Sequence, residues 1–319
     1  MPETIEAADS AFRDDVLAGL SAPIPAIPAR WFYDRRGSEL FDEITRLPSY
    51  EVTRIETALL ERIMPEIAAQ VPANAAVVEF GAGSATKTPV LLSAVRPAFY
   101  VPVDISGDYL RDSAADIQRQ FPDVRVEPVV ADFARPFDLP DSIAACPKLG
   151  FFPGSTIGNF VPRSATDLLR QFRALLGTGS HLLIGMDRVK PVERMIAAYD
   201  DPEGVTAEFN LNILNRINRE LDGDIPVDAF RHEARWNDIL SRIEMHLVAT
   251  RDVTFAVAGK TFSFARGQSI HTENSHKYGQ RGARVLLLAG GWTPVAEWSA
   301  PGGEFAIVLA EAQRERSAP

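Results

Sequence analysis

The sequence predicts an α/β protein whose main part is a Rossmann-like, doubly wound parallel sheet closed by a C-terminal antiparallel hairpin. Short apolar runs alternate with helix-like segments over residues 75–187, and this alternation stops over residues 190–275. Two more apolar runs follow near the C-terminus. Apolar strands that alternate with helices are typical of a parallel sheet covered on both faces. The middle segment predicts a second, α+β domain.

A first short helix is expected before Pro23, and two further helices are expected before the first strand. Segment 38–47 has apolar residues at helical spacing, with Ser38 as its expected N-cap, and Pro48 ends it. Residues 53–69 form a second amphipathic pattern. Both helices precede the alternating region, so they lie outside the predicted strand–helix repeat.

The alternating region holds five candidate strands and three candidate helices. The strands are expected at residues 75–80, 100–105, 124–130, 148–152 and 181–186, and the helices at 85–95, 107–120 and 163–176. Right-handed crossovers between parallel strands would bring the carboxyl ends of these strands to one edge of the sheet.

The segment after residue 190 departs from this pattern. It holds a helical stretch at 210–221 and strand-like runs at 242–250 and 261–264, before helix returns over 276–290. Runs at 295–298 and 304–310, joined by Pro301-Gly302-Gly303, predict the closing hairpin. We expect residues 56–190 and 276–319 to form the main domain, and residues 1–55 and 191–275 the second.

Composition excludes several classes of function. The chain has 319 residues and a net charge of −10, without a basic tract, which argues against nucleic-acid and anionic-membrane partners. No apolar run approaches the roughly 20 residues that span a bilayer, and the polar N-terminus is no signal peptide, so we expect a cytoplasmic protein. Cys146 is the single cysteine. His271 and His276 flank Glu273 without helical ligand spacing, so no metal site is predicted.

A glycine-containing turn after the first strand indicates a ligand site. Gly81, Gly83 and Ser84 open it, and Asp104 follows about 20 residues later at the end of the second strand. A carboxylate there commonly accepts both hydroxyls of an adenosine ribose. Position 86 is Thr, where the dinucleotide fingerprint has a third glycine, and this weakens an NAD site.

Asp132 and Phe133 end the third strand, where they would supply an acceptor for an adenine amine and an apolar wall. Each of these residues alone is explained by turn chemistry, but together they favour an adenosine-type cofactor. Glu79 adds negative charge before the turn, which argues against phosphates and suits the cationic S-adenosylmethionine. The C-terminal hairpin also resembles that of the class I methyltransferase sheet, by analogy of fold.

Asn159 ends the fourth strand, where its amide would bind an amine or carboxylate of a substrate; a loop-stabilising role is the alternative. The following residues lack the Pro-Pro-aromatic pattern of amide- and base-methylating enzymes, which argues against a nucleobase target. Ser155 is not in a nucleophile elbow, because Pro153 precedes it by two positions, so a hydrolase is not expected.

Several long blocks resemble the ergothioneine-pathway L-histidine Nα-methyltransferases. They run in order along nearly the whole chain. They are residues 31–34 (WFYD), 37–44 (GSELFDEI), 47–50 (LPSY), 79–87, 152–160 (FPGSTIGNF), 198–201 (AYDD), 209–221, 243–245 (IEM) and 272–277 (TENSHK). The resemblance implies a class I fold with a substrate-binding second domain, S-adenosylmethionine as cofactor, and three methyl transfers to the α-amine of histidine that give hercynine.

The resemblance also implies roles for individual residues. Those that would hold substrate are Asn159 and Tyr199 at the amino-acid head group, Glu273 and Ser275 at the imidazole, Tyr50 at the imidazole end, Met245 against the ring and Tyr33 near the amine, acting through water. Those that would hold cofactor are Gly81, Gly83, Ser84, Lys87, Asp104, Asp132 and Phe133. Tyr33 and Asn159 are the candidates for catalysis.

The expected partners are histidine and its mono- and dimethyl forms, and we expect a monomer. Three alternatives stay open at this point. They are a methyltransferase of the same build that acts on another amino acid or small amine, an NAD-dependent oxidoreductase, and a non-catalytic adenosine-binding module.

Overall fold

The computed structural model describes residues 2–72 and 74–314, and the chain divides into two compact units. Unit 1 comprises Met1–Tyr50 and Pro191–Ser275, and unit 2 comprises Glu51–Lys190 and His276–Pro319. The segment 191–275 of unit 1 therefore leaves unit 2 after Lys190 and returns to it at His276.

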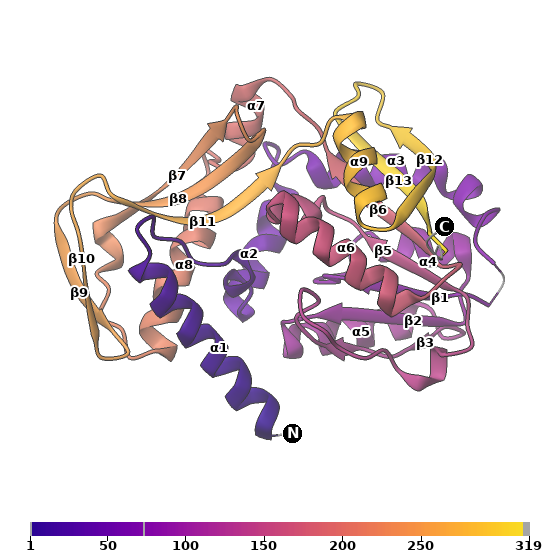
Figure 1. Cartoon of the computed structure of the whole chain (residues 1–319), viewed down its shortest axis with the longest axis horizontal. Coiled ribbons are helices and arrows are strands. Elements are labelled where there is room, and N and C mark those ends of the chain that lie inside the picture. The colour runs from indigo at the N-terminus through magenta and orange to yellow at the C-terminus, as the bar shows by residue number, and fades with distance from the viewer. Residues whose placement is uncertain (1, 73, 315–319) are drawn as a thin grey trace, which may run out of the picture. The chain divides into compact units, whose positions relative to one another are not determined.

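Unit 2 is built on one mixed sheet with the strand order β12-β13-β6-β5-β1-β2-β3, in which β4 also pairs with β2 (Figure 1). The strands are β1 (Ala76–Phe80), β2 (Phe99–Asp104), β3 (Arg125–Val126), β4 (Val129–Val130), β5 (Lys148–Phe152), β6 (His181–Asp187), β12 (Trp292–Ser299) and β13 (Phe305–Ala312). The pairs among β1 to β6 are parallel, whereas β13 is antiparallel to β6 and to β12. The predicted α/β sheet with its C-terminal antiparallel hairpin is confirmed.

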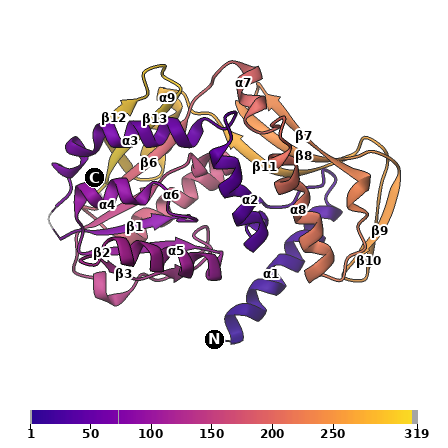
Figure 2. The same cartoon turned by 180° about the vertical axis from the view of Figure 1, so that it is seen from behind.

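Helices cover both faces of this sheet. α6 (Pro162–Leu176) and α9 (Gln280–Ala289) lie on the face turned toward the viewer in Figure 1. α3 (Val52–Ala68), α4 (Thr88–Val95) and α5 (Gly107–Gln120) lie on the other face, which Figure 2 shows. The short 3₁₀ turns η2 (Asp141–Ile143) and η3 (Thr156–Asn159) flank β5. The layers explain why these strands read as continuous apolar runs.

The core of unit 2 is centred on aromatic side chains between the sheet and α6. The rings of Phe80 and Phe172 stack with centroids 3.7 Å apart, and Phe152 meets Phe172 edge-on at 5.2 Å. All three side chains are fully buried. Burial of each is worth about 1.5–3 kcal/mol, so this cluster fixes the strand ends that carry the polar residues described below.

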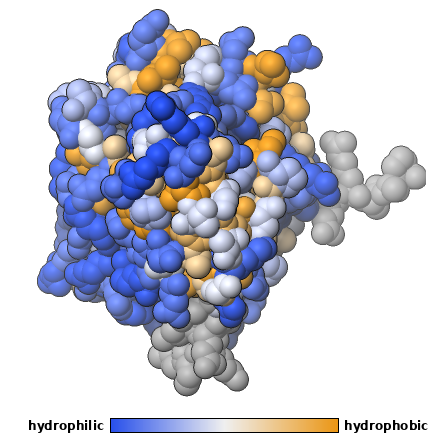
Figure 3. Space-filling view, turned by 90° about the vertical axis from the view of Figure 1, so that its left-hand side faces the viewer, coloured by the Kyte–Doolittle hydropathy of each residue, from blue (hydrophilic) through white to orange (hydrophobic). Residues whose placement is uncertain are grey.

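Unit 1 combines a sheet of order β11-β8-β7 with helices and a separate hairpin. Its elements are α1 (Pro2–Ser21), η1 (Ala29–Phe32), α2 (Arg35–Arg46), α7 (Val192–Ala197), α8 (Val205–Glu220), η4 (Val227–Ala229), β7 (Phe230–Asn237), β8 (Arg242–Ala249), β9 (Val253–Val257), β10 (Lys260–Phe264) and β11 (Ser269–His276). β7 and β8 are antiparallel, as are β9 and β10. The side seen in Figure 3 is largely hydrophilic, with scattered apolar side chains.

The helix expected at 38–47 and the strand expected at 124–130 differ in the structure. Helix α2 begins at Arg35, and its N-cap is Asp34, whose Oδ1 accepts a 2.7 Å hydrogen bond from Gly37 N; the expected cap Ser38 lies inside the helix and is buried. The expected strand 124–130 is split into β3 and β4 around Pro128, which has no N–H to donate to a neighbouring strand.

Candidate functional site

The turn after β1 leaves an open stretch of backbone at the carboxyl edge of the sheet. Gly81 and Gly83 both have positive φ, 73° and 49°. A Cβ at Gly83 would meet no atom within 4 Å, so the conformation rather than crowding requires glycine there. The turn continues through Ala85, also at positive φ, and delays α4 to Thr88, three residues after the expected start of the helix.

Asp104, at the end of β2, is tied to this turn. Its Oδ2 accepts a hydrogen bond from Gly83 N at 3.0 Å, and its Oδ1 accepts one from Ser106 N at 2.9 Å. Burial raises the pKa of Asp104, against the effect of these backbone N–H donors. Each carboxylate oxygen has a second lone pair, so Asp104 can accept from a ligand while it fixes the turn.

Asp132 and Phe133 follow β4 at the same edge. Asp132 Oδ1 accepts from Ala134 N at 3.0 Å, and Oδ2 lies 3.6 Å from Arg135 Nε. A Cβ on Gly81 would lie 3.4 Å from the Phe133 ring, which therefore covers the turn. The structure thus brings Gly81, Asp104 and Phe133 together, as parallel strand order requires.

Lys87 is held by a residue that sequence reasoning missed. Its Nζ lies 2.6 Å from Oε2 of Glu56, a residue of α3 whose side chain is 1% exposed. The two Glu56 oxygens also accept from Gly154 N, at 3.0 and 2.8 Å. Glu56 therefore joins the loop after β1 to the loop after β5. The only sequence signal was a carboxylate on the apolar side of an amphipathic helix.

Glu79 does not present its charge to the turn, contrary to our interpretation of the sequence. Its side chain is buried, and Oε2 accepts from Thr88 Oγ1 of α4 at 2.6 Å and from Tyr100 OH of β2 at 2.7 Å. Burial raises the pKa of Glu79 to about 7, although both hydroxyl donors oppose the shift. The carboxyl group is therefore a structural element of the core, and its charge is no argument about the ligand.

The Glu79→Gln variant is expected to show a changed pH dependence of folding stability. Between pH 4.5 and about 7 the folded protein keeps a proton that the unfolded chain has released. Its stabilising contribution is fully present below pH 4.5 and is lost as the pH rises to about 7. The loss amounts to at most about 3 kcal/mol.

Urea unfolding of both proteins from pH 4 to pH 8 measures this effect. The lowered pKa values of His246 and His271 act in the opposite direction over part of that range, but they are common to both proteins and cancel in the difference. The variant should gain stability relative to the parent from pH 4.5 to 7. A difference that does not vary with pH would contradict the assignment.

Asn159 ends η3, just beyond β5. The loop before it turns through Ser155, at φ 57°, whose Oγ accepts a 2.8 Å hydrogen bond from Asp187 N. Gly158 lies so close to the backbone of His276 that a Cβ would meet its carbonyl oxygen at 2.9 Å. Asn159 therefore belongs to the same sheet edge as Gly83 and to a loop fixed from two sides.

The predicted substrate residues of unit 1 gather around a chain of aromatic rings. Tyr199 OH and Ser275 Oγ are hydrogen-bonded at 2.7 Å. The ring of Tyr50 lies edge-on to Tyr199, with centroids 6.0 Å apart, and Phe41 connects Tyr50 (6.4 Å) to Tyr33 (5.7 Å). The structure brings these four predicted residues together through a phenylalanine that we did not predict.

Glu273 and Met245 occupy neighbouring strands. Glu273 precedes Ser275 by two residues in β11; Ser275 is buried and Glu273 is half-buried. Met245 lies in β8 and is 1% exposed, and its backbone oxygen lies 3.1 Å from Thr272 Oγ1. Whether the Met245 side chain packs against a ligand stays a prediction.

A buried polar network supports Tyr199 and β11, and sequence reasoning did not find it. His232 Nε2 lies 2.7 Å from the carbonyl oxygen of Tyr199, to which it must donate, so its Nδ1 accepts from Asn210 Nδ2 at 2.8 Å. Burial lowers the pKa of His232, which keeps this neutral tautomer. Asn210 Oδ1 in turn accepts from Thr272 Oγ1 at 2.8 Å. The network joins α8 to β7 and β11.

The chain is similar to characterised proteins over almost its whole length. Residues 12–312 match the family described as histidine-specific, SAM-dependent methyltransferases. It is 39% identical over 311 residues to a histidine N-alpha-methyltransferase of Mycobacterium tuberculosis, covering 96% of each chain. It is 38% identical over 315 residues to the protein of the same name from Mycolicibacterium smegmatis, again covering 96% of each chain.

Comparison with solved structures agrees on the fold. An S-adenosylmethionine-dependent methyltransferase from Clostridium acetobutylicum superposes with a TM-score of 0.51 at 10% identity, covering 86% of this chain and 99% of the other. Within residues 2–72 and 74–314, no helix has both the length and the apolar character needed to cross a membrane.

Proposed function

This chain belongs to the histidine-specific, SAM-dependent methyltransferase family, and we propose that it transfers methyl groups to the α-amine of L-histidine. Three successive transfers would give hercynine, the trimethylated betaine, as a step of ergothioneine biosynthesis. The observation that carries the proposal is the sheet edge of unit 2, where an open glycine backbone, Asp104 and Phe133 meet. An adenosine carrying a cationic sulfonium suits these groups.

The residues at this edge fit S-adenosylmethionine by their chemistry. Gly83 leaves room for close approach of a ligand to the backbone, and Asp104 can accept from ribose hydroxyls. Asp132 can accept from an amine, and the Phe133 ring offers an apolar face. Gly81, Ser84 and Lys87 complete the proposed cofactor residues. When bound, the cofactor supplies an electrophilic methyl group on sulfur and leaves as a neutral thioether, so no general acid is required.

We assign substrate binding mainly to unit 1. Glu273 and Ser275 would hold the imidazole, with Tyr50 and Met245 beside it, and Tyr199 together with Asn159 of unit 2 would hold the amino-acid head group. The hydrogen bond between Tyr199 and Ser275 supports this assignment, because it fixes one side chain from each of the two groups relative to the other. Positioning of this kind contributes up to about 7–11 kcal/mol in the best intramolecular cases.

The nucleophile is the neutral amine, whose lone pair forms the new N–C bond as the S–C bond breaks. Free α-amines titrate near pH 8, and a nearby sulfonium lowers that pKa further because like charges disfavour protonation. The nitrogen must lose a proton after the first transfer and another after the second. We propose that Tyr33 helps to remove these protons from the nitrogen, acting through water.

The proposal is tested by incubating the purified protein with S-adenosylmethionine and each of a panel of amino acids. Mass spectrometry should show histidine gaining one, two and three methyl groups, with the trimethylated product accumulating. Methylation of another amino acid or amine in preference to histidine would favour the alternative of a related methyltransferase. That the enzyme acts as a monomer is a separate prediction, which light scattering tests.

Asp104→Ala is expected to weaken binding of S-adenosylmethionine by roughly 10- to 100-fold or more, because each hydrogen bond to a charged group is worth about 1.5–3 kcal/mol. Calorimetric titration measures the affinity. Asp116→Ala, which removes an exposed carboxylate from α5, is the matched control and should bind normally. Unchanged affinity in a folded Asp104→Ala protein would remove Asp104 from the cofactor site.

A further inference from the structure

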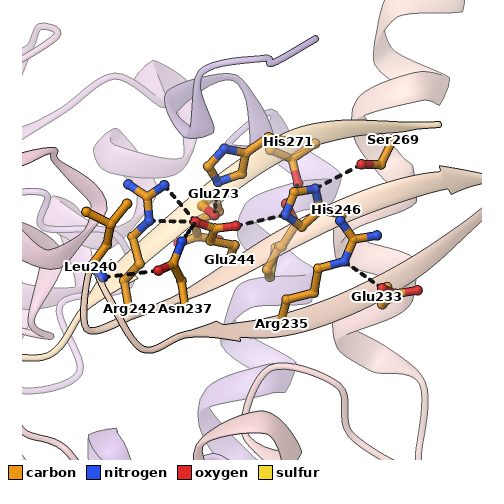
Figure 4. A network of polar contacts seen from close by, with 12 residues as sticks. Glu233, Arg235, Asn237, Leu240, Arg242, Glu244, His246, Ser269, His271 and Glu273 are labelled. Carbon is orange, nitrogen blue, oxygen red and sulfur yellow. Dashed lines mark hydrogen bonds and ion pairs between the residues drawn. The ribbon is translucent and has the colours of Figure 1, made fainter. Parts of the chain in front are cut away.

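One face of the unit 1 sheet carries a cluster of side chains that the proposed reaction does not use (Figure 4). Glu244 and His246 leave the same face of β8, two residues apart, and His271 comes from the adjacent strand β11. One oxygen or nitrogen atom from each of the three side chains lies within 4.8 Å of the other two. The rings of His246 and His271 stack with centroids 4.9 Å apart.

We propose that Glu244, His246 and His271 form a binding site for a divalent transition-metal ion of the Zn²⁺ class. Two imidazole nitrogens and one carboxylate oxygen are a common set of three protein ligands for such an ion, with water completing the coordination. Sequence spacing paired His271 with His276 and found no further ligand, so it predicted no metal site. The register of two strands supplies the ligands that the linear sequence separates.

Neighbouring side chains hydrogen-bond to Glu244 and His246 and so orient them. Such hydrogen bonds commonly orient the ligands of metal sites in proteins. Oε1 of Glu244 accepts from Arg242 Nε (2.8 Å) and Asn237 Nδ2 (2.9 Å), which leaves Oε2 facing His246 Nε2 at 3.2 Å. His246 Nδ1 lies 3.2 Å from Ser269 Oγ. A hydroxyl either donates or accepts, so the ring can carry its proton on Nδ1 and turn the Nε2 lone pair to an ion.

Distances and charges set limits on the site. Ligand atoms around tetrahedral Zn²⁺ lie roughly 3.3–3.5 Å apart, given bonds of about 2.0–2.2 Å. The pair Glu244 Oε2–His246 Nε2, at 3.2 Å, is already close to that spacing, so the ring of His271 is the ligand that would adjust on binding. The nearby guanidinium groups are matched: Arg242 pairs with Glu244 and Arg235 with Glu233. Their positive charge predicts weaker binding than at a four-ligand structural zinc site.

Occupation of this site would join β8 to β11 two residues before Glu273. His271 Nε2 already lies 2.9 Å from the backbone oxygen of Glu273. The ion would thus restrain the strand that carries the proposed imidazole contacts; this consequence alone rests on the proposed function. Metal binding itself is independent of methyl transfer, so the two proposals can fail separately.

The test titrates the full-length protein, stripped with a chelator, against Zn²⁺ in competition with a chromophoric indicator, and records the visible spectrum with Co²⁺. We expect one equivalent to bind and Co²⁺ to show the absorption of a site with nitrogen ligands. His246→Ala, His271→Ala and Glu244→Gln should each weaken Zn²⁺ binding at least tenfold. The control His181→Ala, at the start of β6 in the other unit, should bind like the parent.

Folding is checked by circular dichroism and urea unfolding without metal, and Glu244→Gln keeps the shape of the side chain should the histidine variants unfold. Absence of stoichiometric binding would overturn the proposal, as would equal affinities of the parent and a folded Glu244→Gln protein. Methyl transfer by the stripped protein is recorded separately, and its presence or absence bears on the proposed function only.

Discussion

Replacing Glu273 by alanine is expected to lower kcat/KM for histidine by roughly 10³- to 10⁴-fold while binding of S-adenosylmethionine stays the same. A site built to hydrogen-bond a polar ring loses most when one of its buried partners is removed. Glu273 lies two residues before Ser275 in β11, and Ser275 Oγ is hydrogen-bonded to Tyr199 OH, whereas the proposed cofactor residues belong to unit 2. The effect should therefore fall on histidine.

Initial rates followed by mass spectrometry give kcat/KM, and calorimetry gives the affinity for each ligand. Glu311→Ala, an exposed glutamate on strand β13, is the matched control and should be fully active. The assignment is wrong if Glu273→Ala loses affinity for the cofactor but binds histidine normally.

Asp187→Asn is expected to cost about 3–5 kcal/mol of unfolding free energy, a large share of the 5–15 kcal/mol of an ordinary domain. Asp187 ends β6 and is paired with two lysines: Lys277 Nζ lies 2.8 Å from Oδ2, and Lys190 contacts Oδ1. The three side chains are at most 4% exposed. The amide would leave two ammonium groups close together in a buried site without a negative partner.

Urea unfolding at pH 7 measures this loss, and Asp167→Asn is the control. Asp167 makes a comparable contact to Arg170 at 3.1 Å on the exposed side of α6, where such a pair is worth about 0–1 kcal/mol. The two lysines hold the pKa of Asp187 below its usual value of 3.8, although burial alone would raise it. Its contribution is thus present above pH 3.8 and is lost only as the pH falls through the lower, folded pKa. A loss below about 1 kcal/mol at pH 7 would contradict the role given to Asp187.

The sheet of unit 2 could be predicted from sequence because burial on both faces leaves an unambiguous pattern. β5 and α5 have the expected bounds, and the other strands of this sheet that carry polar residues at their ends are close to theirs. Unit 1 was harder. Strands β7 and β11 were missed because one face of each is polar and hydrogen-bonded, so neither forms an apolar run.

The candidate site could be predicted where it depends on strand ends and not where it depends on side-chain pairing. The turn at Gly83 and the carboxylate of Asp104 follow from the order of parallel strands. Glu56 could not be assigned, because its contact with Gly154 spans 98 positions and leaves no local pattern. For the same reason the cluster of Glu244, His246 and His271 becomes visible only once β8 and β11 are paired.

The buried contacts of Asp187 also bear on whether residues 191–275 can be replaced by a short linker. Residues 191–275 begin directly after Lys190 and end two residues before Lys277, and both lysines contact the carboxylate of Asp187. The entropic cost of closing a loop rises only slowly with its length, by about 0.6 kcal/mol for each doubling, and a shorter loop costs less. All strands of the unit 2 sheet lie outside residues 191–275, so this segment is not required to complete the sheet. A shortened polypeptide, in which a few glycines and serines replace it, offers a route to a stand-alone nucleoside-binding fragment.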